Sequence, residues 1–160
     1  HGGTNVGKAE WRFLDCALFT GRRSPVEVGE DCFASIQSAP MTTARGVTWK
    51  SLFPREVFGN QAILWWGEVW IELGQEMKWG CYEDAEQILY VLEGCGRLSL
   101  WDWTVEVRPG SIAHIIAGAP HAIANTGADR MRLVGSRSRV GRAPMPDYYR
   151  HLVQRQDGRS

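Results

Sequence analysis

Short segments of β-forming residues, separated by turns that contain glycine, follow one another through the central part of this sequence. Such turns occur around Gly74, Gly94, Gly110 and Gly118. Many short strands at this spacing are typical of an all-β sandwich or barrel. The expected strands lie within residues 46–58 and at residues 62–73, 87–92, 97–101, 104–107, 111–116, 121–125 and 131–136.

The end of the chain holds the one segment that we expect to be helical. Residues 146–154 start with a proline, carry Asp147 in the first turn and place Tyr148 and Leu152 on one side, a pattern that favours a helix. The sequence therefore predicts an all-β fold with a short C-terminal helix.

The expected strands and the helix suggest three parts of the chain. We expect a barrel at residues 46–140, followed by the C-terminal helix and tail at residues 141–160. Residues 1–45 are expected to be an N-terminal extension that is partly disordered. Within this extension, residues 11–20 have the composition of a strand that could contact a second subunit.

The expected strand at residues 62–73 has two different faces. Its odd positions are all apolar or glycine, so this face must be covered. Its even positions include Trp66, Glu68, Trp70 and Glu72. The even face is predicted either to line a polar pocket, where Trp66, Trp70 and Glu72 would bind substrate, or to form a solvated surface.

Charge and length narrow the classes of function. The 160 residues include 18 basic and 18 acidic side chains, so no net field attracts nucleic acid or an anionic membrane. No apolar run reaches the roughly 20 residues that a membrane-spanning helix needs. We expect a soluble, cytoplasmic protein that binds neither nucleic acid nor membrane.

Arginine is concentrated near the end of the chain, with eight arginines in residues 130–160. The plainer interpretation is a solvated tail or a contact with a partner subunit. The alternative is binding of an anionic ligand or of RNA, because guanidinium groups pair well with carboxylate and phosphate.

Cysteine and tryptophan give weaker signals. None of the four cysteines forms a Cys-x-x-Cys pair, which argues against a zinc knuckle or a thioredoxin-type site. The eight tryptophans are interpreted either as bulky core and subunit contacts or as the aromatic wall of a ligand pocket.

Two stretches of the sequence resemble the paired motifs of the cupin superfamily. The first runs from Gly74 to Gly94, and the second runs from Gly110 through His121 to Asn125, with 15 residues between Gly94 and Gly110. The resemblance covers residues 62–136 and implies a cupin-type jelly-roll β-barrel.

The resemblance also locates the positions where the family binds a divalent metal with two histidines, one glutamate and a further histidine. Here these positions carry Gly80, Tyr82, Gln87 and His121. Glycine has no side chain to offer, a phenol stays protonated near neutral pH, and a glutamine brings no charge. One imidazole and one amide make a weak site, so we expect no cofactor, with a divalent metal at His121 and Gln87 as the weaker alternative.

A polar cluster remains if the metal is absent. We expect His121, Tyr82 and Gln87 to be catalytic, with His121 as acid or base because imidazole titrates nearest to neutrality. His114, Trp66, Trp70 and Glu72 are the expected substrate-binding residues. The structural alternative is that these side chains only fill the barrel.

Three functions follow from this cluster. The first is a metal-independent enzyme, an isomerase, lyase or cyclase, that binds a small polar or aromatic metabolite in the barrel. The second is a non-catalytic small-molecule binding or sensor protein, and the third is a metal-dependent enzyme with an unusual ligand set. The resemblance further implies a homodimer.

Overall fold

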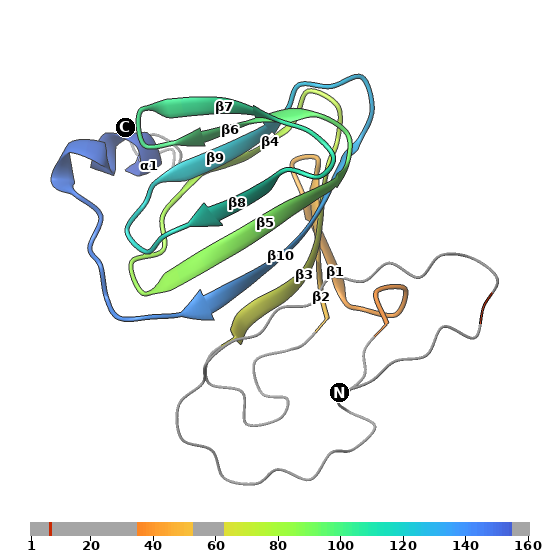
Figure 1. The fold of residues 1–160 in the computed structure, drawn as a ribbon, viewed down its shortest axis with the longest axis horizontal. Coiled ribbons are helices and arrows are strands. Elements are labelled where there is room, and N and C mark those ends of the chain that lie inside the picture. The colour runs from red at the N-terminus through yellow and green to blue at the C-terminus, as the bar shows by residue number, and fades with distance from the viewer. Residues whose placement is uncertain (1–6, 8–34, 53–62, 155–160) are drawn as a thin grey trace, which may run out of the picture.

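The computed structural model of the protein describes residue 7, residues 35–52 and residues 63–154 (Figure 1). β-Strands make up most of this part of the chain. The strands are β1 (Met41–Ala44), β2 (Val47–Ser51), β3 (Ile63–Ile71), β4 (Glu76–Gly80), β5 (Ala85–Glu93), β6 (Gly96–Leu100), β7 (Trp103–Val107), β8 (Ile112–Ile115), β9 (His121–Asn125) and β10 (Met131–Arg139).

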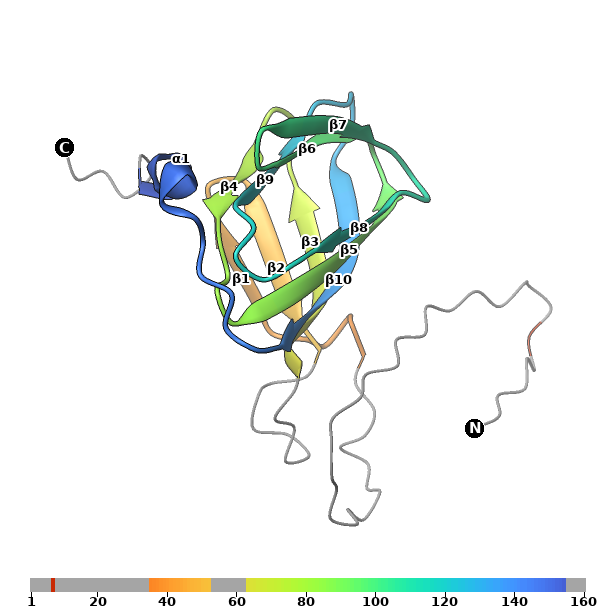
Figure 2. The same ribbon diagram turned by 60° about the vertical axis from the view of Figure 1, so that its left-hand side comes forward.

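The strands form two sheets that enclose one core. The larger sheet has the order β1-β2-β3-β10-β5-β8, and the smaller has the order β4-β9-β6-β7. All their pairings are antiparallel. Figure 2 shows the strands arranged around the interior of the barrel. The expected jelly-roll architecture is confirmed.

The period of two along β3 and β5 decides which side chains enter the core. On β5, Gln87, Leu89 and Val91 are buried, because alternate residues of a strand face the same side of a sheet. On β3, the odd-numbered Val69 and Ile71 belong to the hydrophobic core. The apolar face of β3 is therefore covered, as expected, and its even positions lie on the outer face of the larger sheet.

The turn at Gly94 shows why glycine is needed between two of the strands. Gly94 has a φ of 77°, in the left-handed region that disfavours other residues. A Cβ atom at this position would lie 2.7 Å from Cα of Met131. The turn can therefore bring β5 and β6 close to β10 only with glycine at this position.

The C-terminal segment packs against the end of the barrel where β4 stops. A 3₁₀ turn (η3, Asp147–Tyr149) leads into α1 (Arg150–Gln154), which contacts β4. Just before it, the backbone N–H of Ala143 donates to the carbonyl oxygen of Glu83 at 2.7 Å. None of the described helices is long and apolar enough to cross a membrane.

The observed boundaries differ from the expected ones in three places. β1 and β4 were not among the expected strands, because neither has a clear apolar alternation. β1 pairs with β2, so the larger sheet begins before residue 46. The expected helix at residues 146–154 starts as a 3₁₀ turn. Residues 11–20 lie outside the described part of the chain.

Candidate active site

Two rows of neighbouring side chains meet at one end of the barrel. In the larger sheet, cross-strand pairing aligns Trp65 of β3 with Arg137 of β10, and Arg137 with Gln87 of β5. In the smaller sheet, Gly80 at the end of β4 is aligned with His121 at the start of β9. The register of the two sheets thus gathers residues that are up to 72 positions apart in the sequence.

His121 is held as a neutral imidazole with one nitrogen available. The residue is buried, with 3% of its surface exposed. Its Nδ1 lies 3.0 Å from the carbonyl oxygen of Ala119, and because a carbonyl oxygen only accepts, Nδ1 must carry the hydrogen. Burial lowers the pKa of His121, the hydrogen bond to Ala119 opposes this, and the charge of Arg137 lowers it further. Nε2 is therefore left with a free lone pair, which can accept a proton.

Tyr82 connects His121 with Arg137. Its ring centroid lies 5.7 Å from that of His121, with the two rings tilted by 45°. The guanidinium carbon of Arg137 lies 4.0 Å from the centroid of the Tyr82 ring. At this distance the positive charge lies over the ring face, and the resulting cation–π attraction holds the guanidinium beside Tyr82.

Gln87 and Arg137 each hold a buried polar atom without a partner. No described residue forms a hydrogen bond with Oε1 of Gln87 or with Nε of Arg137. Gln87 is buried, with 4% of its surface exposed. Buried polar groups are nearly always hydrogen-bonded, so either an ordered water or a bound molecule would complete the bonding of these two atoms.

Gly80 leaves space beside His121. A Cβ atom built on Gly80 would meet only the carbonyl oxygen of Lys78, at 4.0 Å. The neighbouring backbone of β9 carries His121 directly opposite. The absence of a side chain at residue 80 therefore opens room next to the imidazole rather than relieving a clash.

The other expected site residues lie elsewhere. Trp66 and Trp70 are on the outer face of β3, where Nζ of Lys50 sits 5.2 Å from the Trp70 ring. Glu72 is exposed and lies 3.8 Å from Arg130. His114 is exposed, and its Nε2 is 2.9 Å from Oε2 of Glu86. The structure does not bring these four residues to His121.

Cys81 and Glu83 flank Tyr82 but are not part of the cluster. Oε2 of Glu83 accepts a hydrogen bond from Arg142 at 3.2 Å, and Oε1 accepts one from the backbone of Met145 at 3.3 Å. Burial raises the pKa of the Cys81 thiol, as does the charge of Glu83, so the thiol is kept protonated at neutral pH.

The donor set at this end of the barrel does not fit a divalent metal ion. Only His121 offers a strong nitrogen ligand, and Gln87 offers an uncharged oxygen. The charge that acts on His121 is the positive guanidinium of Arg137, which lies over the Tyr82 ring. No group of three histidine, cysteine, aspartate or glutamate side chains suited to a metal occurs in the described residues. Divalent cations favour anionic ligands, so no metal chemistry is derived from this arrangement.

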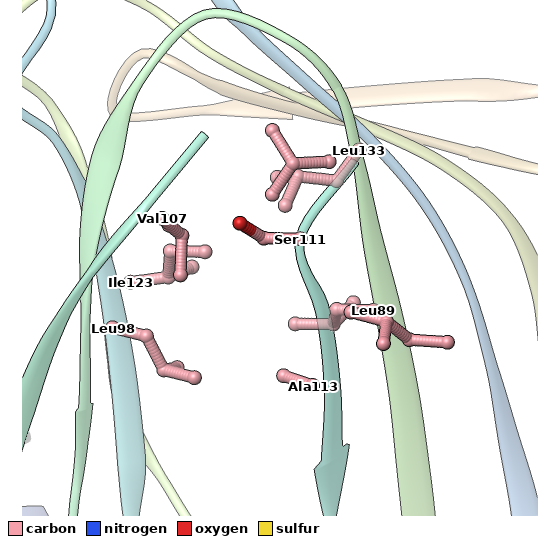
Figure 3. A pocket seen from close by; sticks show the side chains of 9 residues that line it. Leu89, Leu98, Val107, Ser111, Ala113, Ile123 and Leu133 are labelled. Carbon is pink, nitrogen blue, oxygen red and sulfur yellow. The ribbon is translucent and has the colours of Figure 1, made fainter. Parts of the chain in front are cut away.

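An apolar pocket, separate from the polar cluster, lies between the two sheets (Figure 3). Its volume is about 10 Å³, which corresponds to about one water-sized sphere. Figure 3 shows aliphatic side chains from both sheets around it, with Ser111 as the polar exception. None of the residues of the polar cluster lines it, and it is too small for a metabolite.

Arg137 was not identified from the sequence as a site residue. The signal was present, because Met131, Leu133 and Gly135 precede it on the same face of β10 and alternate with outward residues. A charged residue that continues a buried period-two pattern points into the interior. At the level of composition, however, Arg137 was one of many arginines at this end of the chain.

Comparison with protein families and solved structures agrees with this architecture. Residues 69–135 match the model of the family described as cupin domain. No curated protein sequence matches the chain.

Several solved structures have a similar fold. A predicted oxalate decarboxylase from Thermotoga maritima is 17% identical, with a TM-score of 0.63 over 68% of this chain and 99% of the other. The polyketide cyclase RemF from Streptomyces resistomycificus is 23% identical, with a TM-score of 0.58 over 70% and 81%. KdgF from Halomonas sp. is 15% identical, with a TM-score of 0.57 over 68% and 95%. At these identities the likeness establishes the fold alone.

Proposed function

Since this chain is a member of the cupin superfamily, we propose that it is a metal-independent enzyme that moves a proton on a small molecule bound at Tyr82, Gln87 and His121. Isomerisation, dehydration and cyclisation all need such a transfer and require no oxidant. A polyketide cyclase has the same fold, so the barrel is compatible with this class of reaction.

His121 is the proposed base. Its Nδ1–H is engaged with Ala119, which orients the ring and leaves Nε2 to remove a proton from a carbon next to a carbonyl group. The electrons of the broken C–H bond form a C=C bond, and the carbonyl oxygen becomes an enolate oxygen. Return of the proton to a different atom completes an isomerisation.

Tyr82 and Gln87 are the proposed partners of this step. The Tyr82 ring lies 5.7 Å from the His121 ring, so the two side chains can act on one bound molecule, and the phenol can donate a hydrogen bond to the enolate oxygen. The unpaired Oε1 of Gln87 can accept a hydrogen bond from the substrate and orient it.

One observation supports this proposal above the others. A buried neutral imidazole with a free nitrogen lies beside a glycine whose missing side chain leaves room for a ligand. A histidine with only a structural role would be expected to use both nitrogens or to be enclosed by packed side chains.

Hydrogen exchange tests the proposal directly. Pyruvate and dihydroxyacetone are incubated in D₂O with the protein, and deuterium incorporation next to the carbonyl is followed by NMR. We expect exchange above the buffer rate with at least one compound, and a rate reduced about 100-fold or more in His121→Asn, because general base catalysis contributes about 10²–10⁴. Tyr82→Phe is expected to reduce the rate by a smaller factor.

A steric variant serves as an independent check. Gly80→Leu places a side chain in the space next to His121 without meeting a neighbouring atom closer than 4.0 Å at Cβ, so it should fold and lose exchange. Equal rates in the wild type and His121→Asn would overturn the proposal. Binding of a probe without any exchange would instead favour the non-catalytic binding function.

A further inference from the structure

The guanidinium of Arg137 differs from four other arginines of the same segment because it faces no carboxylate. Arg130, Arg132, Arg142 and Arg150 each lie within 4.0 Å of an aspartate or glutamate. Arg137 forms no such pair with any residue that the structure describes, and its Nε is buried without a partner. A buried unpaired donor on a cation is costly unless an anion binds there.

The position of Arg137 suits recognition of a planar anion. Its guanidinium carbon lies over the Tyr82 ring, 4.0 Å from the ring centroid. This contact is an attraction between a charge and an aromatic ring, so it does not supply a hydrogen-bond acceptor for the guanidinium N–H groups. A carboxylate can then approach edge-on and accept two parallel hydrogen bonds.

Gln87 adds an acceptor next to this donor. It is the direct cross-strand neighbour of Arg137, both residues lie on the inner face of the larger sheet, and its Oε1 has no partner. The pair therefore presents one unpaired donor and one unpaired acceptor. The matching ligand carries an anionic oxygen and, close to it, an O–H or N–H group.

We propose that Arg137 and Gln87 form a binding site for a small carboxylate with a hydroxyl group on the adjacent carbon, such as a 2-hydroxy acid or the enol of a 2-oxo acid. Arg137 binds the carboxylate, and Gln87 accepts the hydrogen bond of the hydroxyl. The substrate of the reaction at His121 would then belong to this class of carboxylates, an inference that rests on the proposed function. The guanidinium supplies the positive charge at the end of the barrel.

Calorimetric titration tests the site with lactate and two matched compounds. Propionate lacks the hydroxyl, and lactamide lacks the charge. We expect lactate to bind the wild type, and lactamide to bind at least about tenfold more weakly, because hydrogen bonds to a charged group are stronger than those between neutral groups. Propionate should bind several-fold more weakly than lactate, and Gln87→Leu should remove the difference between the two acids.

Two arginine variants with the same change in net charge complete the test. Arg137→Gln should weaken lactate binding about tenfold or more, while Arg139→Gln, at an exposed position of the same strand, should bind within about twofold of the wild type because it removes charge outside the site. Three results would each overturn the site. The first is equal lactate binding by Arg137→Gln and the wild type, the second is equal binding of lactamide and lactate by the wild type, and the third is no lactate binding by the wild type. Circular dichroism confirms the fold of each variant.

The two proposals can fail separately. Lactate binding that is retained in His121→Asn, with no exchange in any variant, would reject the catalytic role and support the carboxylate site. Exchange with dihydroxyacetone but no binding of any acid would reject the carboxylate site and support the catalytic role.

Discussion

Arg132 and Arg137 lie on the same strand, five residues apart, and have opposite environments. Arg132 is on the outer face of β10, where its guanidinium is 2.5 Å from Glu68 and 3.1 Å from Glu93. Arg137 is on the inner face, over the ring of Tyr82, with no carboxylate partner among the described residues. One guanidinium is neutralised by the protein, and the other is left for a ligand.

The outer pair also contains unpaired atoms, namely Oε2 of Glu68 and Nε of Arg132. Their charges nevertheless compensate each other, so the outer face needs no external ion. What distinguishes the inner face is therefore the uncompensated charge together with the unpaired acceptor of Gln87, and not the presence of unpaired atoms alone.

Replacing each arginine by methionine should give the largest difference in the free energy of unfolding between the two positions. Arg132→Met leaves the buried carboxylate of Glu68 without its cation, and we expect it to lower the free energy of unfolding by about 3 kcal/mol. Arg137→Met strands no carboxylate and loses a cation–π contact worth about 0.5–1 kcal/mol. Urea unfolding measures both values. Equal destabilisation by the two variants would show that Arg137 has a structural role.

The two buried amides should differ in the same way. Asn125 donates to the carbonyl oxygens of Ile71 and Asp129 at 2.9 and 2.8 Å, and its Oδ1 accepts from the backbone of Gly127 at 3.0 Å. We expect Asn125→Leu to cost about 2 kcal/mol and Gln87→Leu to stay within about 1 kcal/mol of the wild type, because only the first leaves satisfied groups unpaired. The midpoint of urea unfolding measures the stability of both variants. A larger loss of stability in Gln87→Leu than in Asn125→Leu would contradict the expected difference between the two amides.

Stability near neutral pH should reveal the buried imidazole. Burial holds the pKa of His121 below its ordinary value of 6.5 in the folded protein, so the unfolded chain binds a proton more readily. The contribution of His121 is present above pH 6.5 and is lost as the pH falls from 6.5 through the lowered pKa. We expect the wild type to lose more stability over this range than His121→Gln, as measured by chemical unfolding at each pH. Parallel pH profiles would contradict a buried neutral histidine.

Divalent metals should have the smallest effect. Because the donor set lacks a carboxylate and faces a cation, addition of Mn²⁺ or Zn²⁺, or treatment with EDTA, should shift the Tm by less than about 1 °C. Elemental analysis of protein purified without chelator should find fewer than about 0.1 metal ions per chain. A stoichiometric metal that is lost in His121→Ala would favour the metal-dependent alternative.

The fold was largely predictable because its signals are local. Glycine turns such as the one at Gly94 and the apolar alternation that includes Val69 and Ile71 each depend on a few neighbouring residues. The outer strand β1 and the irregular β4 were missed because their pairing depends on distant partners rather than on their own pattern.

The site was predictable only in part. The motif spacing identified Tyr82 and His121, and the structure brings their rings together. Alternation along β3 could not tell which face is inside, so it did not decide whether Trp66 and Trp70 meet the ligand. The unpaired charge of Arg137 depends on the absence of a nearby carboxylate, which only the three-dimensional arrangement reveals.

NMR of the arginine side chains can show whether only the inner arginine binds a carboxylate, by comparing the Nε–Hε signals of Arg132 and Arg137 during a titration with lactate. We expect the Arg137 signal to shift progressively and saturate as its Nε–H gains an acceptor, while the Arg132 signal stays in place because Glu68 and Glu93 already compensate its charge and leave no attraction for lactate. An unchanged Arg137 signal, or equal shifts of both signals, would contradict the account.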